Sequence, residues 1–399
     1  MPNSTQLQQL GFTHPTIWKE VTKVMGELEQ LVWNDPLVTD DLTRAEGARY
    51  LTRVIAGALP MTMELADANY PQFFHLLSTR IHWGLPATDC HYQWAAVHGD
   101  NVYRISGDRG TARVFDIETR KDHFAHIADW TLHDRLTKFD VGANNHVDIV
   151  LSRVRPEGVR NWIQLAEGPG NIIFRQYYYD WNTEQPARLS IVNENAKYPP
   201  PTLTEAAIGD GLELFCDWIR DVPKRFAQVV NTYYAAPKNS MVFDTIDFGW
   251  KSLKYGKGIY QCAPDEALIL EVKLPKSYYW SIQLCSHFWE ARDYHLRQTS
   301  LNGHQAQIDD DGAGNRIFRA VISHQDPGIA NWLDAGGHEQ GLLAIRYYEP
   351  DGTPIPSMRR VKLAELRDSL PASTPAVTAE ARQISLRDRA WSTARLRRE

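Results

Sequence analysis

One ordered pattern of residues occurs twice in this 399-residue chain, and it constrains the fold more than any other feature. The pattern is a serine, a turn, a glycine, a β-branched residue, one further residue, an asparagine and a tryptophan. A strand-like run with an arginine follows. The pattern begins at Ser152 and again at Ser323, and the gap before the arginine differs by one residue. So long a match predicts two copies of one structural unit.

The matched residues predict how each unit turns a corner. A strand-like stretch precedes each serine, and the glycine can adopt the positive φ of a sharp turn. The asparagine can hydrogen-bond to neighbouring backbone, and the tryptophan can close one end of a β-sandwich. The corner residues are Gly158, Asn161 and Trp162 in the first copy and Gly328, Asn331 and Trp332 in the second.

An arginine lies on the strand after each corner. Strand alternation places Arg175 and Arg346 on sheet faces that also carry apolar or aromatic side chains. A guanidinium on such a face needs a carboxylate, a set of carbonyls or an anionic ligand. We expect ion pairs that stabilise the corners; the alternative is a clamp for a substrate carboxylate in one copy. The substrate-binding candidates from the repeats are Arg175, Arg346, Asn331 and Trp332.

Helical periodicity flanks the strand-like regions. One predicted helical stripe consists of Leu212, Phe215, Trp218, Ile219, Val222 and Phe226. In residues 267–274 and 280–285, alternate apolar residues predict strands with one core face, and residues 371–375 are typical of a linker. Thr43 and Thr202, each with a glutamate three residues later, predict helix starts, and Pro60 predicts a helix end. The predicted fold class is α+β: two related antiparallel β-sandwich-like halves with N-terminal and inter-half helices and a C-terminal helical tail. The predicted regions are an N-terminal helical region (1–78), a first β-rich half (79–200), a helical connection (201–240), a second β-rich half (241–356), and a linker with a basic helical tail (357–399).

Three stretches of the chain resemble a known family. They are RNWIQL with IIFRQYYYDWNTEQPARLSI, then YYWSIQLCSHFWEARDYHLRQTSLNG, and DPGIANWLDAGGHEQG with IRYY. Together they are similar to bacterial proteins that carry the domain of unknown function 1214. The resemblance implies a β-sandwich core with peripheral helices, and it implies no chemistry. A family stretch of the form PDNxY is replaced here by residues 87–92, Ala-Thr-Asp-Cys-His-Tyr.

Bulk properties narrow the partners and the compartment. A net charge of −6 and a pI near 6.2 give no general attraction for nucleic acid. No run approaches the roughly 20 apolar residues of a membrane helix, and the N-terminus lacks the apolar region of a signal peptide. The four scattered cysteines form no CxxC pair, which favours reduced thiols in the cytoplasm. We expect a small-molecule ligand and consider a homo-oligomer formed through the basic tail.

The densest set of reactive side chains lies at residues 287–302, in the second half alone. Because the repeat does not account for this segment, we expect it to carry function. An aspartate–tyrosine pair can polarise a hydroxyl or carbonyl group, and either histidine can transfer a proton. The alternative is a polar loop at a sandwich edge. The candidates are His287, Asp293, Tyr294 and His295 for catalysis, and Trp289 and Asn302 for substrate binding.

A second candidate segment follows the first arginine strand. Asp180 and Glu184 can act as an acid/base pair, and Tyr179 and Trp181 can contact a substrate. The alternative is that both carboxylates stabilise a turn and pair with Arg175 or Arg188.

No cofactor is expected. The motifs GxGxxG, GxxxxGK[ST] and GxSxG are absent from the strands and turns that would need them. His123 and His126, with Asp122, His133 and Asp134 nearby, have a spacing that could place two imidazoles on one helix face. The glutamate of an HExxH-type site is missing, and we expect no metal.

These observations favour a cofactor-independent enzyme of bacterial catabolism, a hydrolase or lyase. Its expected substrate is an apolar, oxygenated small molecule such as a steroid, terpenoid or aryl compound, because Trp and Tyr are abundant. The alternatives are a non-catalytic small-molecule binding protein and a carbohydrate-active β-sandwich protein.

Overall fold

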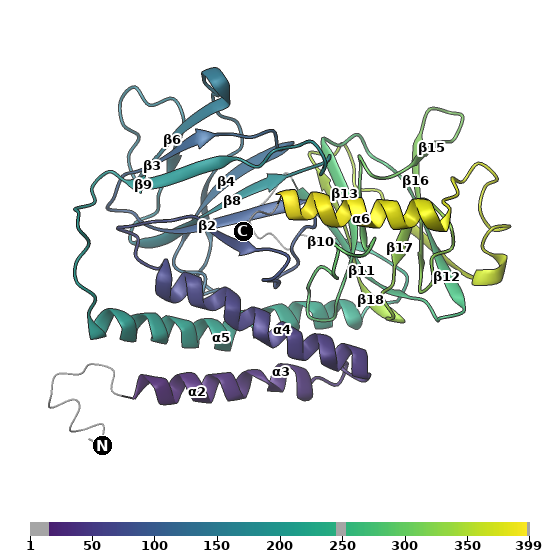
Figure 1. The fold of residues 1–399 in the computed structure, drawn as a ribbon, viewed down its shortest axis with the longest axis horizontal. Helices are drawn as coiled ribbons and strands as arrows, with labels where there is room; N and C mark the ends of the chain where they lie inside the picture. Colours follow the sequence, from purple (N-terminus) through teal and green to yellow (C-terminus); the bar gives the residue numbers. More distant parts are fainter. Residues whose placement is uncertain (1–15, 245–252, 397–399) are drawn as a thin grey trace. The chain divides into compact units, whose positions relative to one another are not determined.

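The computed structural model describes residues 16–244 and 253–396 (Figure 1). The chain divides into two compact units whose segments alternate along the sequence. Unit 1 comprises Met1–Trp83, His91–Gln176 and Gln185–Phe226, and unit 2 comprises Gly84–Cys90, Tyr177–Glu184 and Ala227–Glu399. None of the helices in the described part of the chain has the length and apolar character that crossing a membrane requires.

Unit 1 begins with helices α2 (Ile17–Leu28), α3 (Gln30–Trp33) and α4 (Asp41–Leu59). A helix begins near Thr43, as predicted, but its capping residue is Asp40 and not Thr43. The carboxylate of Asp40 already caps α4 by accepting the backbone N–H of Thr43 at 2.8 Å. The α-helix ends at Leu59, directly before Pro60 as predicted, and a π-helical turn, Pro60–Glu64, follows it.

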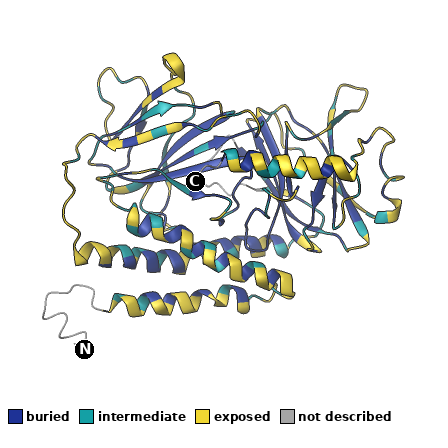
Figure 2. Cartoon of the chain, in the orientation of Figure 1, coloured by how far each residue is buried: buried dark blue, intermediate teal, exposed yellow. Residues whose placement is uncertain are grey.

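Helix α5 (Glu205–Tyr234) is a single helix of 30 residues. The hydroxyl of Thr204, not that of the predicted Thr202, accepts the backbone N–H of Ala207 at 3.2 Å at its start. The apolar residues of the predicted stripe are buried, beside exposed positions on the other side of the helix (Figure 2). They are Leu212, Phe215, Trp218, Ile219, Val222 and Phe226.

Two β-sheets form the sandwich of unit 1. In order, the five-stranded sheet contains β1 (Phe74–Leu77), β2 (Cys90–His98), β8 (Pro169–Tyr177), β4 (Val114–Lys121) and β5 (Leu132–Leu136). The four-stranded sheet contains β7 (Trp162–Gln164), β6 (His146–Ser152), β3 (Tyr103–Asp108) and β9 (Arg188–Asn193). Apolar side chains from both sheets, such as Ile105, Ile117 and Phe174, form one core between them.

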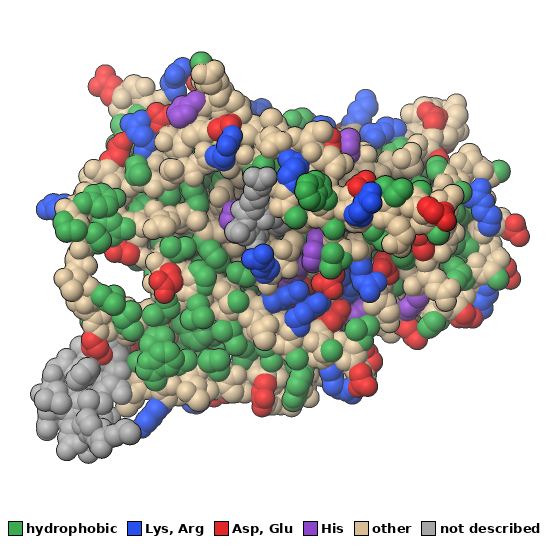
Figure 3. All heavy atoms as spheres, in the orientation of Figure 1, with side chains coloured by type: hydrophobic (Ala, Val, Ile, Leu, Met, Phe, Trp, Pro, Cys, Tyr) green, Lys and Arg blue, Asp and Glu red, His purple; other side chains and the backbone are tan. Residues whose placement is uncertain are grey.

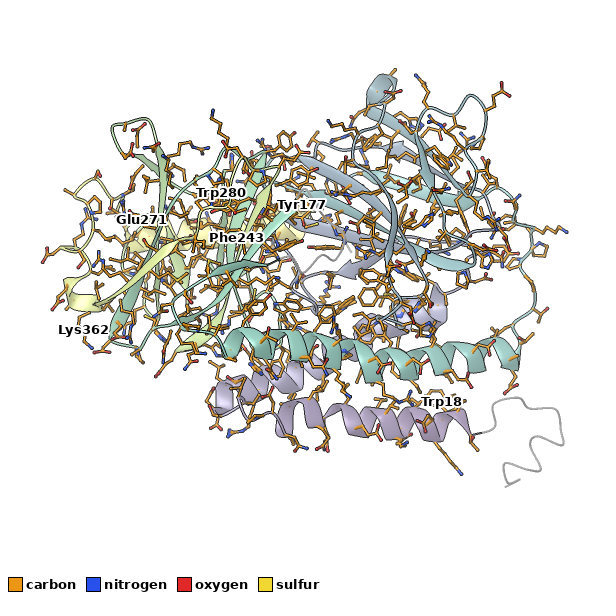
Figure 4. All side chains as sticks on the ribbon, turned by 180° about the vertical axis from the view of Figure 1, so that it is seen from behind. Trp18, Tyr177, Phe243, Glu271, Trp280 and Lys362 are labelled. Atoms are coloured by element: carbon orange, nitrogen blue, oxygen red, sulfur yellow. The ribbon has the colours of Figure 1, made fainter. Side chains whose placement is uncertain are left out.

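Unit 2 is a second sandwich. Its five-stranded sheet contains β10 (Val242–Asp244), β11 (Leu253–Gln261), β18 (Gln340–Tyr348), β13 (Tyr279–Cys285) and β14 (Ser300–Asn302). The opposing sheet contains β15 (Ile308–Asp310), β16 (Arg316–Ser323), β12 (Glu266–Lys273) and β19 (Ser357–Lys362), with β17 (Trp332–Asp334) paired to β16. Alternate residues of β12 and β13 share the core, as their spacing predicted; Trp280 is labelled in Figure 4.

The two units repeat one topology, which confirms the predicted fold class. In each, the strand before the corner pairs in parallel with the short strand after it: Val150 lies opposite Trp162, and Val321 opposite Trp332. In both units the corner glycine has a positive φ, 75° in the first and 69° in the second.

The corner asparagines make equivalent hydrogen bonds. The amide of Asn161 donates to the carbonyls of Asp140 at 2.8 Å and Asp148 at 3.0 Å. The amide of Asn331 donates to the carbonyls of Gln307 at 2.6 Å and Arg319 at 2.9 Å. Each asparagine oxygen also accepts a backbone N–H from the same neighbouring loop. One side chain thus joins the strand before the corner to an adjacent loop.

The C-terminal region of unit 2 contains the predicted helical tail, α6 (Ala379–Leu396). The segment before it pairs with the second corner: Ala330 N–H donates to Pro375 O at 3.0 Å, and Val377 N–H donates to Gly328 O at 2.8 Å. Residues 371–375, predicted as a linker, therefore lead into a stretch that is hydrogen-bonded to unit 2. Arg397 and Arg398, part of the predicted basic tail, lie outside the described residues.

We expect Asn331→Ala to lower the free energy of unfolding by about 2–3 kcal/mol, because three buried or half-buried backbone groups lose their partner. Urea unfolding followed by tryptophan fluorescence measures the change. Asn315→Ala, in an exposed turn, should cost less than about 0.5 kcal/mol. Equal effects of the two substitutions would contradict the structural role of the corner asparagine.

Candidate functional site

A pocket of about 440 Å³ opens in unit 2 against α6. Most of its walls come from three segments: residues 180–182, residues 298–307, and one side of α6 between residues 381 and 392. Ala330 and Val377 complete the lining. Polar and charged side chains are prominent in the lining. They include Asp180, Asn182, Gln298, His304, Gln305 and Arg389, together with the ring of Trp181.

A buried carboxylate organises the wall behind this pocket. Asp89, only 2% exposed, accepts hydrogen bonds from Tyr279 Oη at 2.6 Å, Asn302 Nδ2 at 2.8 Å and Trp181 Nε1 at 2.9 Å. Burial raises the pKa of Asp89, and the three donors only partly oppose that rise. Burial and the nearby carboxyl likewise raise the pKa of Tyr279. The network joins segments 84–90 and 177–184 to strands β13 and β14.

The 177–184 segment is a tight, hydrogen-bonded turn. The Tyr179 hydroxyl accepts Trp280 N–H at 2.8 Å, and Tyr179 N–H donates to Glu184 Oε2 at 2.8 Å. Asp180 accepts the backbone N–H of Asn182 at 2.9 Å and the hydroxyl of Thr183 at 2.5 Å. Both carboxylates therefore stabilise the turn, as the structural alternative predicted. The arginines it named pair elsewhere, Arg175 with Glu118 and Arg188 with Asp108. Asp180 remains at the pocket wall.

Asp180 also faces an imidazole. His304 Nε2 lies 3.8 Å from Asp180 Oδ1, and the His304 side chain is 52% exposed. Burial alone would raise the pKa of Asp180, but bonds from Thr183 and Asn182, with the charge of His304, lower it below its usual value. An ionised carboxylate beside an accessible imidazole is an arrangement that can accept and return a proton.

Arginines of α6 hold the helix against the pocket. The Arg389 guanidinium lies 4.6 Å above the Trp181 ring and donates to Ser300. Arg395 donates to the carbonyls of Trp181 and Glu184. Arg382 is 4% exposed and pairs with Asp326 at 2.9 Å. These three arginines of the basic tail therefore bind acceptors within unit 2. An oligomer formed through the tail stays a prediction.

The predicted catalytic residues at 287–295 do not line this pocket. The ring of His287 packs against Tyr234 and Phe288, at centroid distances of 4.9 and 5.2 Å. Asp293 has a φ of 20°, and its backbone carbonyl accepts the N–H groups of a turn. Tyr294 is buried, with its ring 5.8 Å from that of His295 and 6.2 Å from that of Trp181. A catalytic role for these residues stays a prediction.

The remaining binding candidates divide between structural positions and the pocket wall. The carbonyl of Trp289 accepts the N–H of Leu85 at 2.8 Å, and Asn331 and Trp332 belong to the repeat corner. Trp181 lines the pocket, and Asn302 supports it through Asp89. The structure thus brings together Asp180, Trp181 and Asn302 among the sequence candidates.

The two repeat arginines bind protein acceptors. In unit 1, Arg175 Nη1 lies 2.7 Å from Glu118 Oε2. In unit 2, Arg346 donates to Gln283 Oε1 at 2.6 Å and to the carbonyl of Leu85 at 2.9 Å. Glu118 and Gln283 therefore take the same place in the repeat, one charged and one neutral. These contacts agree with a structural role better than with a free clamp.

Unit 1 holds a second carboxylate beside this pair. Asp116 is fully buried on the same strand as Glu118, with Arg135 at 2.5 Å and Arg175 at 3.6 Å. Burial and then the charge of Glu118 raise the pKa of Asp116 to about 7. The arginines Arg175 and Arg120 outweigh burial at Glu118 and lower its pKa.

The pKa of Asp116 is higher in the folded state than in the unfolded state. As the pH rises, the unfolded chain therefore loses this proton at a lower pH than the folded protein does, which favours unfolding. Wild-type stability should therefore fall between about pH 4 and 7 on account of this group, by at most about 4 kcal/mol. We expect Asp116→Asn, relative to the wild type, to gain stability steadily across that range. Urea unfolding at several pH values measures this gain.

Asp108→Asn is the matched control for this experiment. A bond from Gly110 N–H lowers the pKa of Asp108, so its contribution is lost only at more acidic pH. The stability difference between Asp108→Asn and the wild type should be flat from pH 5 to 7. A flat difference for Asp116→Asn as well would argue against a protonated Asp116.

The histidines that were considered for metal binding lie in a turn, and His123 makes hydrogen bonds within the protein. His123 and His126 lie in a turn and not on a helix face. His123 Nε2 is 3.1 Å from Met61 O, and its Nδ1 accepts Ala125 N–H at 3.0 Å. Burial lowers the pKa of His123 to about 4. Within residues 16–244 and 253–396, no three His, Cys, Asp or Glu side chains are grouped to hold a metal ion.

Three residues of the site were missed in the sequence: Asp89, His304 and Arg389. Asp89 lies inside the 87–92 stretch that departs from the family form, and that departure was the available signal. His304 follows the candidate segment by two residues. Arg389 lies seven residues after Arg382, the spacing of one helix face, but its contacts are far away in the sequence.

The fold and pocket define a duplicated β-sandwich protein with peripheral helices. Residues 263–352 match the family model described as "Protein of unknown function (DUF1214)". The chain thus carries the DUF1214 region, as its motifs predicted, and that region lies within unit 2. No match was found among curated proteins.

The solved structures that are similar to this chain include two bacterial proteins. An uncharacterised protein from Burkholderia cenocepacia is 28% identical, covers 91% of this chain and 99% of its own length, and has a TM-score of 0.82. The VPA0106 protein from Vibrio parahaemolyticus is 12% identical, covers 86% of this chain and 100% of its own length, and has a TM-score of 0.44. The first supports the fold, and neither brings a known activity.

Proposed function

We propose that this protein is a cofactor-independent enzyme of hydrolase or lyase type, which acts on an oxygenated small molecule in the unit 2 pocket. The observation that carries the proposal is the Asp180–His304 pair at the pocket wall, with 3.8 Å between Oδ1 and Nε2. A bacterial catabolic role in the cytoplasm fits this proposal. The four cysteines are free and buried, which favours a reducing compartment.

In this proposal Asp180 orients His304 and His304 moves the proton. The turn bonds keep the pKa of Asp180 low, so its negative charge persists beside His304. His304 then takes a proton from a substrate hydroxyl or water and returns it to the leaving group or carbonyl oxygen. Its backbone N–H donates to Asn302 Oδ1 at 2.9 Å, which links its position to the Asp89 network.

The pocket lining favours an oxygen-rich ligand. A volume of about 440 Å³ lies within the usual range for small-molecule sites. The amide nitrogens of Asn182 and Gln305 offer donors, and the Trp181 ring offers an apolar surface. The Gln298 amide is already used, because it donates to Ala330 O and Trp332 O and accepts from Arg382. Steroid, terpenoid and aryl compounds with several oxygen substituents therefore remain the substrate classes to test.

Two alternatives use the same pocket. A non-catalytic binding protein would employ these amides without proton transfer. A carbohydrate-active protein is favoured by the Trp181 ring and by two carboxylates in the lining, Asp180 and Asp388. A thermal-shift screen against steroids, aryl acids and oligosaccharides separates the ligand classes, since a bound ligand stabilises the folded protein.

For a substrate that the screen yields, we expect His304→Gln and Asp180→Asn each to reduce kcat at least about 100-fold, because each removes part of the proton-transfer pair. The melting temperature should change little, since His304 is half exposed and asparagine keeps the turn acceptor of Asp180. Steady-state kinetics and thermal melts measure both quantities.

Asp293→Asn is the comparison variant, because Asp293 lies outside the pocket lining. It should retain turnover. Loss of turnover in Asp293→Asn together with normal turnover in His304→Gln would move the active site to the 287–295 segment. Binding without turnover by the wild type, across all ligands that stabilise it, would favour the binding-protein alternative.

A further inference from the structure

The guanidinium of Arg389 is held by neutral acceptors. Its Nε donates to the carbonyl of Tyr294, and its Nη2 donates to Ser300 O at 3.1 Å and Ser300 Oγ at 2.5 Å. Within the described residues, Nη1 donates to no protein atom, and no carboxylate lies within ion-pair distance of Arg389. The arginine nevertheless lines the pocket.

The surroundings of Arg389 remove it from much of the solvent. Burial lowers its pKa to about 10, so the group still carries its charge at neutral pH. One face lies 4.6 Å from the Trp181 ring, whose N–H donates to the buried Asp89. Donating this hydrogen bond polarises the indole, so that its N–H edge becomes more positive and its ring face more negative. The more negative ring face attracts the cation more strongly.

Arg382 provides an internal comparison. It lines the same pocket from the same helix, but its Nε lies 2.9 Å from Asp326 and its other nitrogens donate to Gln298 Oε1 and Ile329 O. Its charge is thus compensated within unit 2. Within the described residues Arg389 has no ion-pair partner, and the charge of the buried Asp89 acts on it only from beyond that distance. A buried cation without an ion pair is costly, and an anionic ligand at Nη1 would reduce that cost.

We propose that Arg389 receives a carboxylate of the ligand, so that the pocket takes oxygenated organic acids. This inference rests on the proposed function, because it concerns the same pocket. One Nη1 amino group suits a single carboxylate oxygen, whereas a phosphate would require more donors. Asp388 also lines the pocket, but its side chain is 58% exposed, so solvent screens its charge. The Trp181 ring can contact the organic part of the acid.

Three matched pairs of probes test this inference: benzoate, 4-hydroxybenzoate and mandelate, each against its primary amide. The readout is the indole N–H resonance of Trp181 in ¹H–¹⁵N spectra, assigned with Trp181→Phe. We expect the acids to shift this resonance and to bind at least about 10-fold more tightly than the amides, as one charge-assisted hydrogen bond predicts. Arg389→Gln should abolish this preference, and Arg389→Lys should restore part of it.

Arg387→Gln is the matched control, since its side chain on the same helix is 76% exposed. It should bind the acids as the wild type does. Because Arg389 also contacts Tyr294 and Ser300, thermal melts of each variant establish that the fold is retained. Arg389→Lys keeps the inference testable if Arg389→Gln is unstable.

The outcomes separate the two proposals. Equal binding of acids and amides, or acid binding that survives in Arg389→Gln, would overturn the carboxylate assignment and leave the pocket function standing. Binding of neutral oligosaccharides, with no response of the resonance to the acids, would also overturn the carboxylate assignment and leave the pocket function standing. If neither acids, amides nor oligosaccharides perturb the Trp181 resonance at millimolar concentration, both proposals fail.

Discussion

The buried carboxyl group of Asp89 is the interaction on which the unit 2 site depends. Its three donors come from the 177–184 turn, strand β13 and strand β14, which are far apart in the sequence. In a low-dielectric interior a fully hydrogen-bonded group of this kind specifies one arrangement, because every partner would be unsatisfied in another. The position of Trp181, and through it the stacking surface for Arg389, follows from that arrangement.

The two units share one β-sandwich framework, and the candidate functional features lie where the units differ. Both units repeat the strand order, the parallel corner pairing and the asparagine bridge. At the repeat arginine, unit 1 uses the carboxylate of Glu118 and unit 2 the amide of Gln283. The unit 2 pocket has α6 as a wall. Opposite charges remain interspersed on the molecular face in Figure 3, which agrees with the modest net charge of −6.

The arginine-rich tail shows how composition can mislead. A run of basic residues usually indicates a solvated face or an acidic partner. Here Arg382, Arg389 and Arg395 donate mainly to carbonyl, hydroxyl and amide oxygens of unit 2, with one ion pair to Asp326. Arginine suits this task because its planar group presents five donors to several acceptors at once.

The sequence by itself determined the duplicated β-sandwich, the core faces of β12 and β13, and the helical tail, since alternation and helical spacing are local properties. It also indicated Asp180, Trp181 and Asn302 as members of a site. Only the tertiary structure decided that Asp89, His304 and Arg389 join them, and that the 287–295 side chains lie outside the pocket. The reason is physical: the pocket is made by hydrogen bonds and stacking between residues up to about two hundred positions apart, and no local periodicity records such contacts.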